Sequence, residues 1–323
     1  MKNQTKNSWN KTERNKYLFL FAILIFPLAQ FAIFYVYMNI NNILLAFRQL
    51  HNDGSSHWVG LKWFKEIFSY GTGSQAEELW IAFKNNIKMF FLTWFIGMPL
   101  QILFGYYLFK KRFGHGLVRI VYMLPSMVSG IVMSLLFLSF TEEAIPQLMQ
   151  KLFHKQVPNL IRSNDTAFGV QVFYTLWLGF TTSIIIYSNA MFALDGSIFE
   201  SGQIDGTTSW TELIYLVIPM ITPTLSTYII TGFSGIFTIS GSLFIFYDYS
   251  APKSAMLMGY WLFKQGMVGD LSSSSLSAAV SLLLTLITLP LTMIVRWIMD
   301  RIDPMRDEKM SRKMKKFKGV GVK

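Results

Sequence analysis

The chain has 323 residues, of which 52% are hydrophobic, 16% aromatic and only 15% charged, and its mean hydropathy is +0.38. A soluble protein carries about a quarter charged residues, so the composition excludes an ordinary soluble enzyme and indicates an integral membrane protein. There is no cysteine, which excludes disulfides and thiol chemistry. The net charge of +11 is not accompanied by any groove-reading motif, so we expect contact with anionic membrane lipid and no nucleic-acid binding.

Six apolar segments are each long enough to cross the roughly 30 Å hydrocarbon core of a bilayer. They cover residues 17–38, 87–109, 120–140, 167–194, 222–247 and 276–298. Basic residues precede the first segment as in a signal peptide, but its apolar stretch is too long and no cleavage site follows. We therefore predict an all-α integral membrane protein with six transmembrane helices. It would have an N-terminal segment (1–16), one six-helix domain (17–300) and a basic tail (301–323).

The basic residues are unevenly distributed between the two sides of these helices. Most of the 29 lysines and arginines lie in the N-terminal segment, in the loop after the second helix and in the C-terminal region. The positive-inside rule makes this side cytoplasmic, so both termini are predicted to be cytoplasmic. The loop over about 195–219 falls on the same side by alternation. It has no Lys or Arg and four acidic residues, which suggests that it is reserved for a partner.

Outside the membrane, residues 58–68 read W-V-G-L-K-W-F-K-E-I-F. Apolar residues recur at helical spacing with charged residues between them, which predicts a short helix lying at the membrane interface. Trp58 and Trp63 would anchor it there, because tryptophan favours the interface between lipid and water.

The loop over 195–219 has the pattern of two short helices. Phe199 and Ile204 offer apolar surface on the first, with Glu200 between them, and Gly206 can take the left-handed conformation that ends a helix. Ser209 is spaced from Glu212 as in a capping box, which would open the second helix. Pro219 follows, where a proline bends or restarts the chain. Two angled helices with an exposed carboxylate form a rigid knob suited to docking; the alternative is a capped turn without a partner.

This loop resembles the cytoplasmic "EAA" loop of ABC importer permeases, whose pattern is E-A-A, then Gly, then I-x-L-P at fixed spacing. Ile204, Asp205 and Trp210 match the version found in sugar importers, while Ser201 and Gly202 replace the two alanines. The resemblance implies that the segment is the coupling helix that seats in a groove of an ATPase subunit. The coupling residues would be Glu200, Ser201, Gly202, Ile204, Asp205, Gly206 and Pro219.

Other segments extend the resemblance to maltose-type, carbohydrate-uptake permeases. They are Lys84-Asn85-Asn86, Leu124-Pro125 and residues 175–180, T-L-W-L-G-F. The resemblance places substrate contacts at Ser126, Gly130, Thr175, Leu178, Gly179, Gly232, Ile236 and Ile239. The last three stand where the maltose type has a Ser and two Asn, so specificity for maltose does not follow.

Chemistry along the expected path points to a neutral solute. No Lys, Arg, Asp or Glu lies in the central part of any of the six segments, which argues against a proton- or sodium-coupled carrier. Hydroxyl and aromatic residues are frequent in the fourth and fifth segments. They could bind a sugar through hydrogen bonds and ring stacking, or they could mediate helix packing.

The resemblance thus implies a type I ABC importer permease fold and a permease subunit of a bacterial importer for a carbohydrate, with an oligosaccharide expected. Its partners would be a second permease, ATPase subunits holding ATP and Mg, and an extracytoplasmic solute-binding protein. The chain lacks a Walker A pattern, and its four histidines have no metal-binding spacing. We therefore expect no enzyme activity, cofactor or metal site in it.

Two alternatives remain open. One is a permease for glycerol phosphate, a polyamine or an anionic polysaccharide fragment. The other is a membrane-embedded enzyme, which would need His, Asp, Glu or Cys residues clustered at one depth, and the six segments lack such a cluster.

Overall fold

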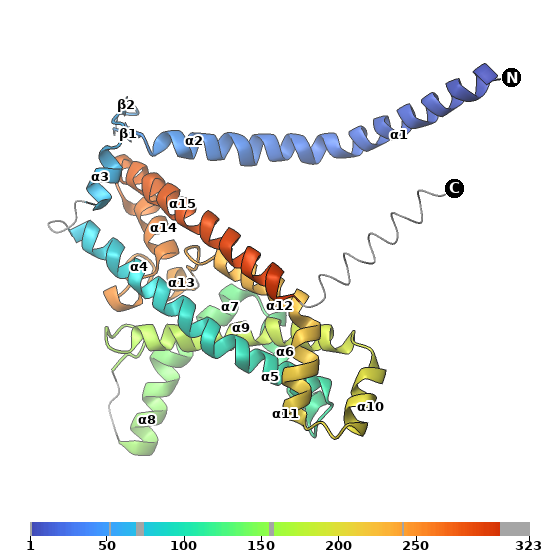
Figure 1. Ribbon diagram of the computed structural model, residues 1–323. Coiled ribbons are helices and arrows are strands. Elements are labelled where there is room, and N and C mark those ends of the chain that lie inside the picture. The colour runs from blue at the N-terminus through green and yellow to red at the C-terminus, as the bar shows by residue number, and fades with distance from the viewer. Residues whose placement is uncertain (1, 52, 69–73, 155–157, 241, 304–323) are drawn as a thin grey trace. The chain divides into compact units, whose positions relative to one another are not determined.

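The structure is a computed structural model that describes residues 2–51, 53–68, 74–154, 158–240 and 242–303 (Figure 1). The chain divides into two compact units. The first comprises residues 1–69 and 269–283, and the second comprises residues 70–268 and 284–323.

The first unit contains a long helical run, a β-hairpin and a short helix. Its elements are α1 (Lys2–Gln30), the π-helical stretch η1 (Phe31–Tyr37), α2 (Met38–Leu45), β1 (Arg48–Leu50), β2 (Ser56–Trp58), α3 (Lys62–Phe68) and the first turns of α15 (Leu271–Ile302). The antiparallel hairpin pairs Arg48 with Trp58 and Leu50 with Ser56. The Leu50 amide donates to Ser275 Oγ at 3.4 Å, which ties the hairpin to α15.

The predicted interfacial helix is wrong at its N-terminal end, because α3 begins at Lys62. Trp58 lies in β2, where the Arg48 guanidinium stands 4.7 Å from the centre of its ring. Gly60 has a φ of +56°, a left-handed conformation that a right-handed helix cannot contain. Trp63 is buried on α3, and its indole Nε1–H donates to the Arg48 carbonyl oxygen at 3.0 Å.

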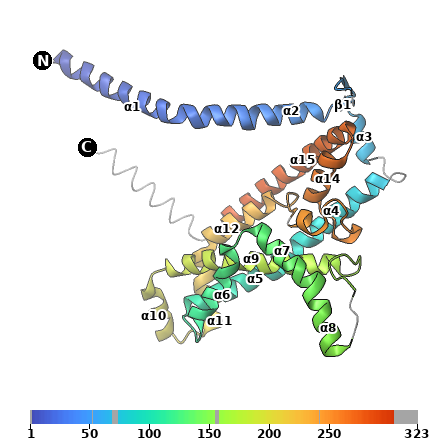
Figure 2. The ribbon, with the colours of Figure 1, turned by 180° about the vertical axis from the view of Figure 1, so that it is seen from behind.

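The regular secondary structure of the second unit is entirely helical in its described residues. Its elements are α4 (Ser74–Leu92), η2 (Thr93–Gly97), α5 (Met98–Phe109), α6 (His115–Met127), α7 (Gly130–Ser139), η3 (Phe140–Ala144), α8 (Ile145–Phe153), α9 (Ala167–Phe192), α10 (Gly196–Ile204), α11 (Ser209–Thr211), η4 (Glu212–Val217), α12 (Ile218–Ser234), α13 (Leu243–Tyr247), the 3₁₀ turn η5 (Lys253–Ala255), α14 (Met258–Val268) and the last turns of α15. The helices α8 and α10 lie at opposite ends of α9 (Figures 1 and 2).

Within the described residues, six helical runs are long and apolar enough to cross a membrane. They are Arg14–Leu45, Glu77–Phe109, Gly130–Phe153, Ala167–Phe192, Ser209–Ser234 and Leu271–Ile302. The predicted all-α fold with six transmembrane helices is therefore confirmed. Three of the six runs, the first, second and sixth, contain the predicted segment and extend beyond it, and the fourth ends two residues before its prediction. The third and fifth runs are displaced from their predicted positions.

The third predicted segment, expected over 120–140, is interrupted. Val128 and Ser129 have extended backbone dihedrals and separate α6 from α7. Pro125 lacks an amide hydrogen and Gly130 is a weak helix former, so the stretch between them is the weakest part of this segment. The run long enough to cross a membrane begins at Gly130 and continues through η3 and α8.

The fifth predicted segment, expected over 222–247, is displaced toward the N-terminus. Its helical run begins at Ser209 and ends at Ser234. Gly232 and Gly235 stand close together at this end, and glycine is among the weakest helix formers. The residues of α13 form a separate short helix beyond it.

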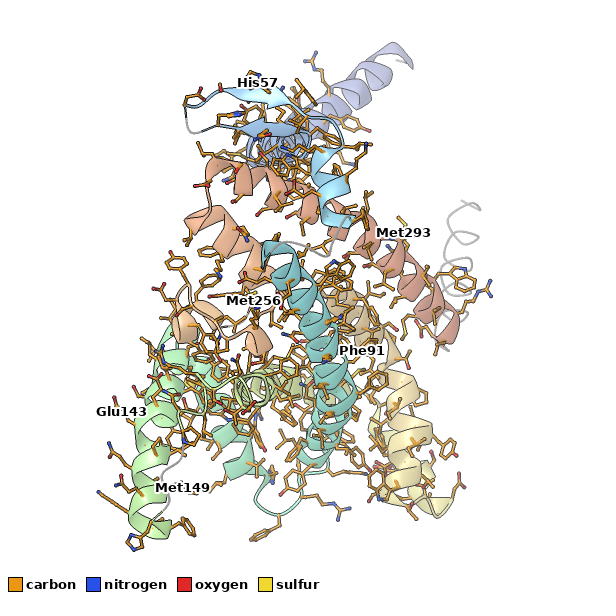
Figure 3. All side chains as sticks on the ribbon, turned by 90° about the vertical axis from the view of Figure 1, so that its left-hand side faces the viewer. His57, Phe91, Glu143, Met149, Met256 and Met293 are labelled. Atoms are coloured by element: carbon orange, nitrogen blue, oxygen red, sulfur yellow. The ribbon has the colours of Figure 1, made fainter. Side chains whose placement is uncertain are left out.

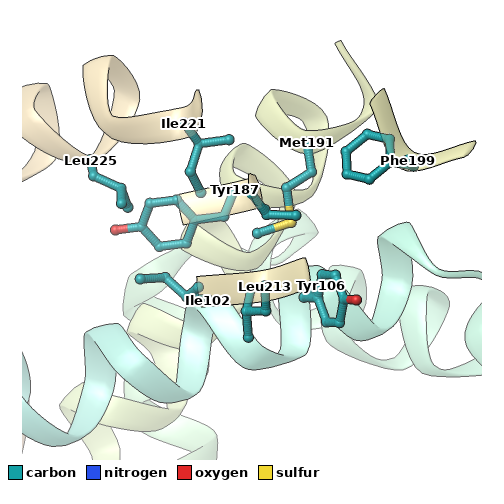
Figure 4. Close-up of a cluster of buried hydrophobic side chains, with 9 residues drawn as sticks. Ile102, Tyr106, Tyr187, Met191, Phe199, Leu213, Ile221 and Leu225 are labelled. Carbon is teal, nitrogen blue, oxygen red and sulfur yellow. The ribbon is translucent and has the colours of Figure 1, made fainter. Parts of the chain in front are cut away.

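A buried apolar cluster holds the second unit together where α5, α9, α10, η4 and α12 meet (Figure 4). Its members are Ile102, Tyr106, Tyr187, Met191, Phe199, Leu213, Val217, Ile221 and Leu225. Helices α5 and α9 approach closely because Gly105 has no side chain. A Cβ at residue 105 would lie 3.2 Å from the Cβ of Tyr187, which is tighter than ordinary van der Waals contact between carbon atoms.

Two buried asparagines on α4 hold the segment that leads into α14. The Asn85 amide donates to the carbonyl oxygens of Lys253, Ser254 and Met256 at 3.0, 2.8 and 3.2 Å. The Asn86 amide donates to the Ile236 carbonyl oxygen, and its own oxygen accepts from the Met258 amide at 3.3 Å. Met256 is consequently buried among neighbouring side chains, whereas Glu143 at the α8 end is exposed (Figure 3).

Candidate functional site

The candidate coupling helix is α10, and its first turn is capped by Asp195. The Ser197 amide donates to Asp195 Oδ1 at 3.0 Å, which satisfies one of the free amides at a helix start. This hydrogen bond holds the pKa of the Asp195 carboxyl below its usual value. The acidic side chain at this position therefore serves the helix itself.

The C-terminal end of α10 is closed by Gly206, as predicted. Gly206 has a φ of +79°, its amide donates to the Gln203 carbonyl oxygen at 3.1 Å, and the Thr207 amide donates to the Gly202 carbonyl oxygen at 3.0 Å. This pair of hydrogen bonds is the Schellman arrangement that ends many helices. Gly202 is buried, and a Cβ there would lie 3.0 Å from Leu216 Cδ1. The missing side chain lets Leu216 pack directly on α10.

One face of α10 is built into the core and the other is free. Phe199 is only 7% exposed and lies beside Met191 of α9 (Figure 4). By contrast, Ile204 is 87% exposed, and Glu200 and Asp205 are exposed as well. The helix thus presents carboxylates and one large apolar side chain to its surroundings while its opposite face is fixed.

The second short helix starts differently from the prediction, because Thr208 and not Ser209 is its N-cap. The Thr211 amide donates to Thr208 Oγ1 at 3.4 Å. Ser209 Oγ instead accepts from Arg112 Nη2 at 2.9 Å. Pro219 lies in the first turn of α12 directly after the π-helical stretch η4, so the regular helix restarts there.

Glu212, the other half of the predicted capping box, is buried in an ion pair. Lys110 Nζ lies 2.5 Å from Glu212 Oε1 and 2.7 Å from Oε2, and the Tyr106 hydroxyl donates to Oε1 at 3.1 Å. The Lys110 ammonium also lies 5.6 Å from the ring centre of Phe199 and 5.9 Å from that of Phe109. Sequence reasoning missed this site, because Lys110 reads as one more basic residue of a cytoplasmic loop.

Three further ion pairs of the second unit are more exposed. They are Arg162–Glu142, Lys253–Glu77 and Lys264–Glu78. Among the described residues, no three His, Asp or Glu side chains come close enough together to hold a metal ion.

The residues predicted for the substrate path lie in three places. Ser126 and Gly130 are exposed on either side of the break between α6 and α7. Thr175, Leu178 and Gly179 are partly buried on α9. Gly232 is partly buried near the end of α12, Ile236 is 5% exposed just beyond it, and Ile239 follows in the irregular segment.

Two of these glycines face large side chains that the sequence did not single out. A Cβ at residue 179 would lie 3.6 Å from Gln101 Nε2 on α5. A Cβ at residue 97 would lie 3.6 Å from the same atom, so two glycines leave room around this amide. At Gly232, the missing side chain is replaced by the indole ring of Trp94.

Hydroxyl and aromatic residues of the α12 region lie on different faces. Thr227, Thr231, Ser234 and Thr238 are exposed, and each hydroxyl donates to a backbone carbonyl oxygen three or four residues earlier. The aromatic residues point inward: Phe233 lies 4.8 Å from Phe90, and Phe237 lies 5.3 Å from Phe83, between ring centres. The expected ring stacking with a sugar therefore has no support here, whereas the hydroxyls remain accessible.

A family model described as "Binding-protein-dependent transport system inner membrane component" matches residues 89–307. This match covers four of the six apolar helical runs whole, the part of Glu77–Phe109 from residue 89 onward, and the whole of the α10 loop.

Individual relatives share only about a quarter or less of their residues with this chain. The polygalacturonan/rhamnogalacturonan transport system permease protein YteP of Bacillus subtilis is 25% identical over 228 residues, which are 68% of this chain and 68% of that protein. The galactooligosaccharides transport system permease protein GanP of the same organism is 21% identical over 257 residues, 73% of this chain and 58% of that protein.

Among solved structures, the chain is similar to a subunit of a bacterial ABC transporter involved in the import of the acidic polysaccharide alginate. The TM-score is 0.77 at 18% identity, and the match covers 91% of this chain and 98% of the other. A second structure of such a transporter, in complex with an alginate pentasaccharide-bound periplasmic protein, gives a TM-score of 0.76. The fold of this chain is therefore that of an ABC importer permease.

Proposed function

The chain belongs to the family of binding-protein-dependent transport system inner membrane components, and we propose that it is a permease subunit of a bacterial ABC importer that translocates a carbohydrate, with an oligosaccharide as the substrate. The observation that carries the proposal is the construction of α10. Its exposed face presents Glu200 and Ile204, while Phe199 on its other face is buried against the membrane helices. A docking element fixed in this way can transmit a displacement to the helices behind it.

The proposal assigns the energy source to partner chains. The coupling residues of α10 and Pro219 would seat in a groove of an ATPase subunit, which holds ATP and Mg, so this chain is a transport subunit and not an enzyme. A second permease would pack beside it in the plasma membrane, and an extracytoplasmic solute-binding protein would deliver the substrate. The α10 end and both termini would be cytoplasmic, as the distribution of basic residues predicts.

A carbohydrate substrate is supported by the exposed hydroxyls of α12 and by the relatives, two of which are named as permeases for polygalacturonan/rhamnogalacturonan and for galactooligosaccharides. The path would run past Ser126, Gly130, Thr175, Leu178, Gly179, Gly232, Ile236 and Ile239. Hydroxyls and backbone groups can hydrogen-bond the many hydroxyls of a sugar without a fixed charge.

An anionic polysaccharide fragment is the second candidate substrate. The YteP protein is named for polygalacturonan, and both solved structures come from importers of the acidic polysaccharide alginate. The two candidates differ in one measurable property, since a uronate oligosaccharide carries a carboxylate on each ring and a neutral one does not.

The test is uptake into proteoliposomes containing the permease, its partner permease, the ATPase subunits and the binding protein. We expect uptake of labelled oligosaccharides that requires ATP, and a panel of neutral and uronate chains of matched length identifies the substrate. Glu200→Ala should weaken retention of the ATPase, whereas Glu143→Ala, which removes an exposed carboxylate at the α8 end, should not. Equal retention in both variants, or uptake without ATP, contradicts the proposal.

A further inference from the structure

We propose that the Lys110–Glu212 ion pair is a positioning element that holds the coupling helix α10, the end of α5 and the start of α12 together, so that they move as one body during transport. The inference rests on the proposed function, since it assigns a role within coupling. It concerns residues that would act through α10.

The ion pair joins two membrane helices at the end where α10 lies. Lys110 follows directly after the last residue of α5, and Glu212 opens η4, which continues into α12. Both carboxylate oxygens contact the ammonium, at 2.5 and 2.7 Å, and the Tyr106 hydroxyl donates to Oε1 at 3.1 Å. The carboxylate is therefore held from α5, by Tyr106, and from the residue that directly follows it, Lys110.

The same ammonium reaches the coupling helix through an aromatic ring. Lys110 Nζ lies 5.6 Å from the ring centre of Phe199 on α10, and 5.9 Å from those of Tyr106 and Phe109. A cation within about 6 Å of an aromatic ring is attracted by its quadrupole, and more strongly when water is excluded. Phe109 and Phe199 also contact each other, with ring centres 5.1 Å apart. One charge thus links α5, α10 and α12.

Because the ion pair is largely buried, its free energy depends strongly on the distance between Lys110 and Glu212. The side chains of Lys110 and Glu212 are 19% and 4% exposed, compared with 25% and 24% for Lys264 and Glu78, whose atoms are 3.6 Å apart. A buried ion pair gains little net stability, because desolvation offsets its attraction, but separating its partners leaves an uncompensated charge in a low dielectric. The pair therefore opposes relative movement of the three elements more than it stabilises the fold.

Neighbouring contacts reinforce the same connection. Arg112 Nη2 donates to Ser209 Oγ at 2.9 Å, which joins the loop after α5 to α11. Leu213, next to Glu212, is 3% exposed and belongs to the buried cluster together with Phe199. A displacement of α10 is thus transmitted to α5 and α12 through contacts on both sides of the ion pair.

The test compares the double variant Lys110→Met/Glu212→Gln with the wild type in the reconstituted complex. Replacing both charges avoids leaving either one buried without a partner. We expect an assembled complex whose ATPase is still stimulated by the loaded binding protein, but whose uptake per ATP hydrolysed falls about fivefold or more, the lower end of typical coupling between sites. The matched control, Lys264→Met/Glu78→Gln, removes a less buried Lys–Glu pair and should leave this ratio unchanged.

A second readout follows α10 directly and requires no transport. The chain has no cysteine, so a spin label at Gln203→Cys, an exposed position on α10, reports on this helix alone. The label should become more mobile in the Lys110→Met/Glu212→Gln background and stay unchanged in the control background. A wild-type complex without ATP-driven uptake would contradict the proposed function, while the label would still decide the role of the ion pair.

An unchanged uptake ratio together with an unchanged label in the double variant overturns the inference. A fall in melting temperature with a wild-type ratio overturns it too, because the pair would then serve stability alone. Should the double variant fail to assemble, Phe199→Leu decides, since it keeps both charges and removes the one ring by which Lys110 contacts α10. A smaller fall in the same ratio is expected for Phe199→Leu, and a wild-type ratio contradicts the inference.

Discussion

The indole ring of Trp94 on η2 occupies the space where a side chain at Gly232 of α12 would lie, and a Cβ at residue 232 would overlap ring atom Cζ2. The ring lies 6.1 Å from Phe233 and 5.6 Å from Phe90, between ring centres. Gly232 therefore has a packing role that accounts for its missing side chain. Its assignment to the substrate path remains a prediction.

Gly232→Ala should consequently destabilise the permease by about 1–3 kcal/mol, the usual cost of overpacking a filled site. Thermal unfolding of the purified complex measures this. Gly169→Ala is the control, because a Cβ at residue 169 on α9 meets nothing within 4 Å. Combining Gly232→Ala with Trp94→Leu should restore part of the loss. Equal melting temperatures of the two glycine variants would show that Trp94 moves aside freely.

Gly206→Leu should distort the end of α10 and detach the ATPase while the permease stays in the membrane. A left-handed conformation costs a residue with a side chain about 1–2 kcal/mol, and asparagine less than most. Gly206→Asn is therefore the control and should retain the ATPase. Copurification of the ATPase with each variant measures the effect. Full retention by Gly206→Leu would mean that the docking assignment of α10 is wrong.

Gly179→Val should block uptake, because its branched side chain would displace the Gln101 amide and fill the space beside α9. Gly179→Ala should be milder, since a Cβ there is at an ordinary 3.6 Å from Gln101 Nε2. Assembly of the complex and the affinity of the binding protein for sugar should not change. Uptake by Gly179→Val at the wild-type rate would rule out this part of the path, and loss of assembly would favour a packing role.

The exposed hydroxyls of α12 can be tested with a matched pair of threonines. Thr231 is exposed and Thr222 is 7% exposed, and both hydroxyls donate to the carbonyl oxygen four residues earlier. Thr231→Val should weaken uptake by about 0.5–1.5 kcal/mol, the value of one net hydrogen bond. Thr222→Val should leave the apparent affinity of uptake unchanged. The same effect from both variants would place recognition elsewhere.

The predicted topology can be measured on single cysteines in a chain that has none of its own. Ser55 lies beside the turn of the β1–β2 hairpin, and Ser311 lies in the basic tail outside the described residues. A membrane-impermeant thiol reagent should label Ser55→Cys in intact cells and spare Ser311→Cys, with both labelled after lysis. The reverse pattern would invert the orientation.

The helical class, the number of membrane runs and the family were predictable from the sequence because each depends on local information. Long apolar stretches give the runs, and the spacing of Glu200, Gly206 and Pro219 gives the resemblance. The left-handed Gly206 was also predictable, because few residues other than glycine adopt this conformation readily. The structure confirms its φ of +79°.

What the sequence could not give are contacts between distant residues. Ser209 and Glu212 have the spacing of a capping box. In the structure, however, the Glu212 carboxylate is buried and pairs with Lys110, which lies 102 positions earlier in the sequence. In the same way, no residue near Gly232 in the sequence indicates that the Trp94 ring packs against it. The break at Val128 was missed because a continuous apolar stretch is equally compatible with an unbroken helix and with two helices joined by extended residues.

The two asparagines of α4 have a consequence for biosynthesis. The partners of Asn85 lie 168 to 171 residues later in the chain, so this span is synthesised before the carbonyl oxygens to which its amide donates. An unpaired amide in an apolar medium is costly, and closing so long a loop adds its own entropic cost. Packing of the second span is therefore completed only when the segment before α14 has been synthesised. A chain truncated before that point would lack all three partners of the Asn85 amide.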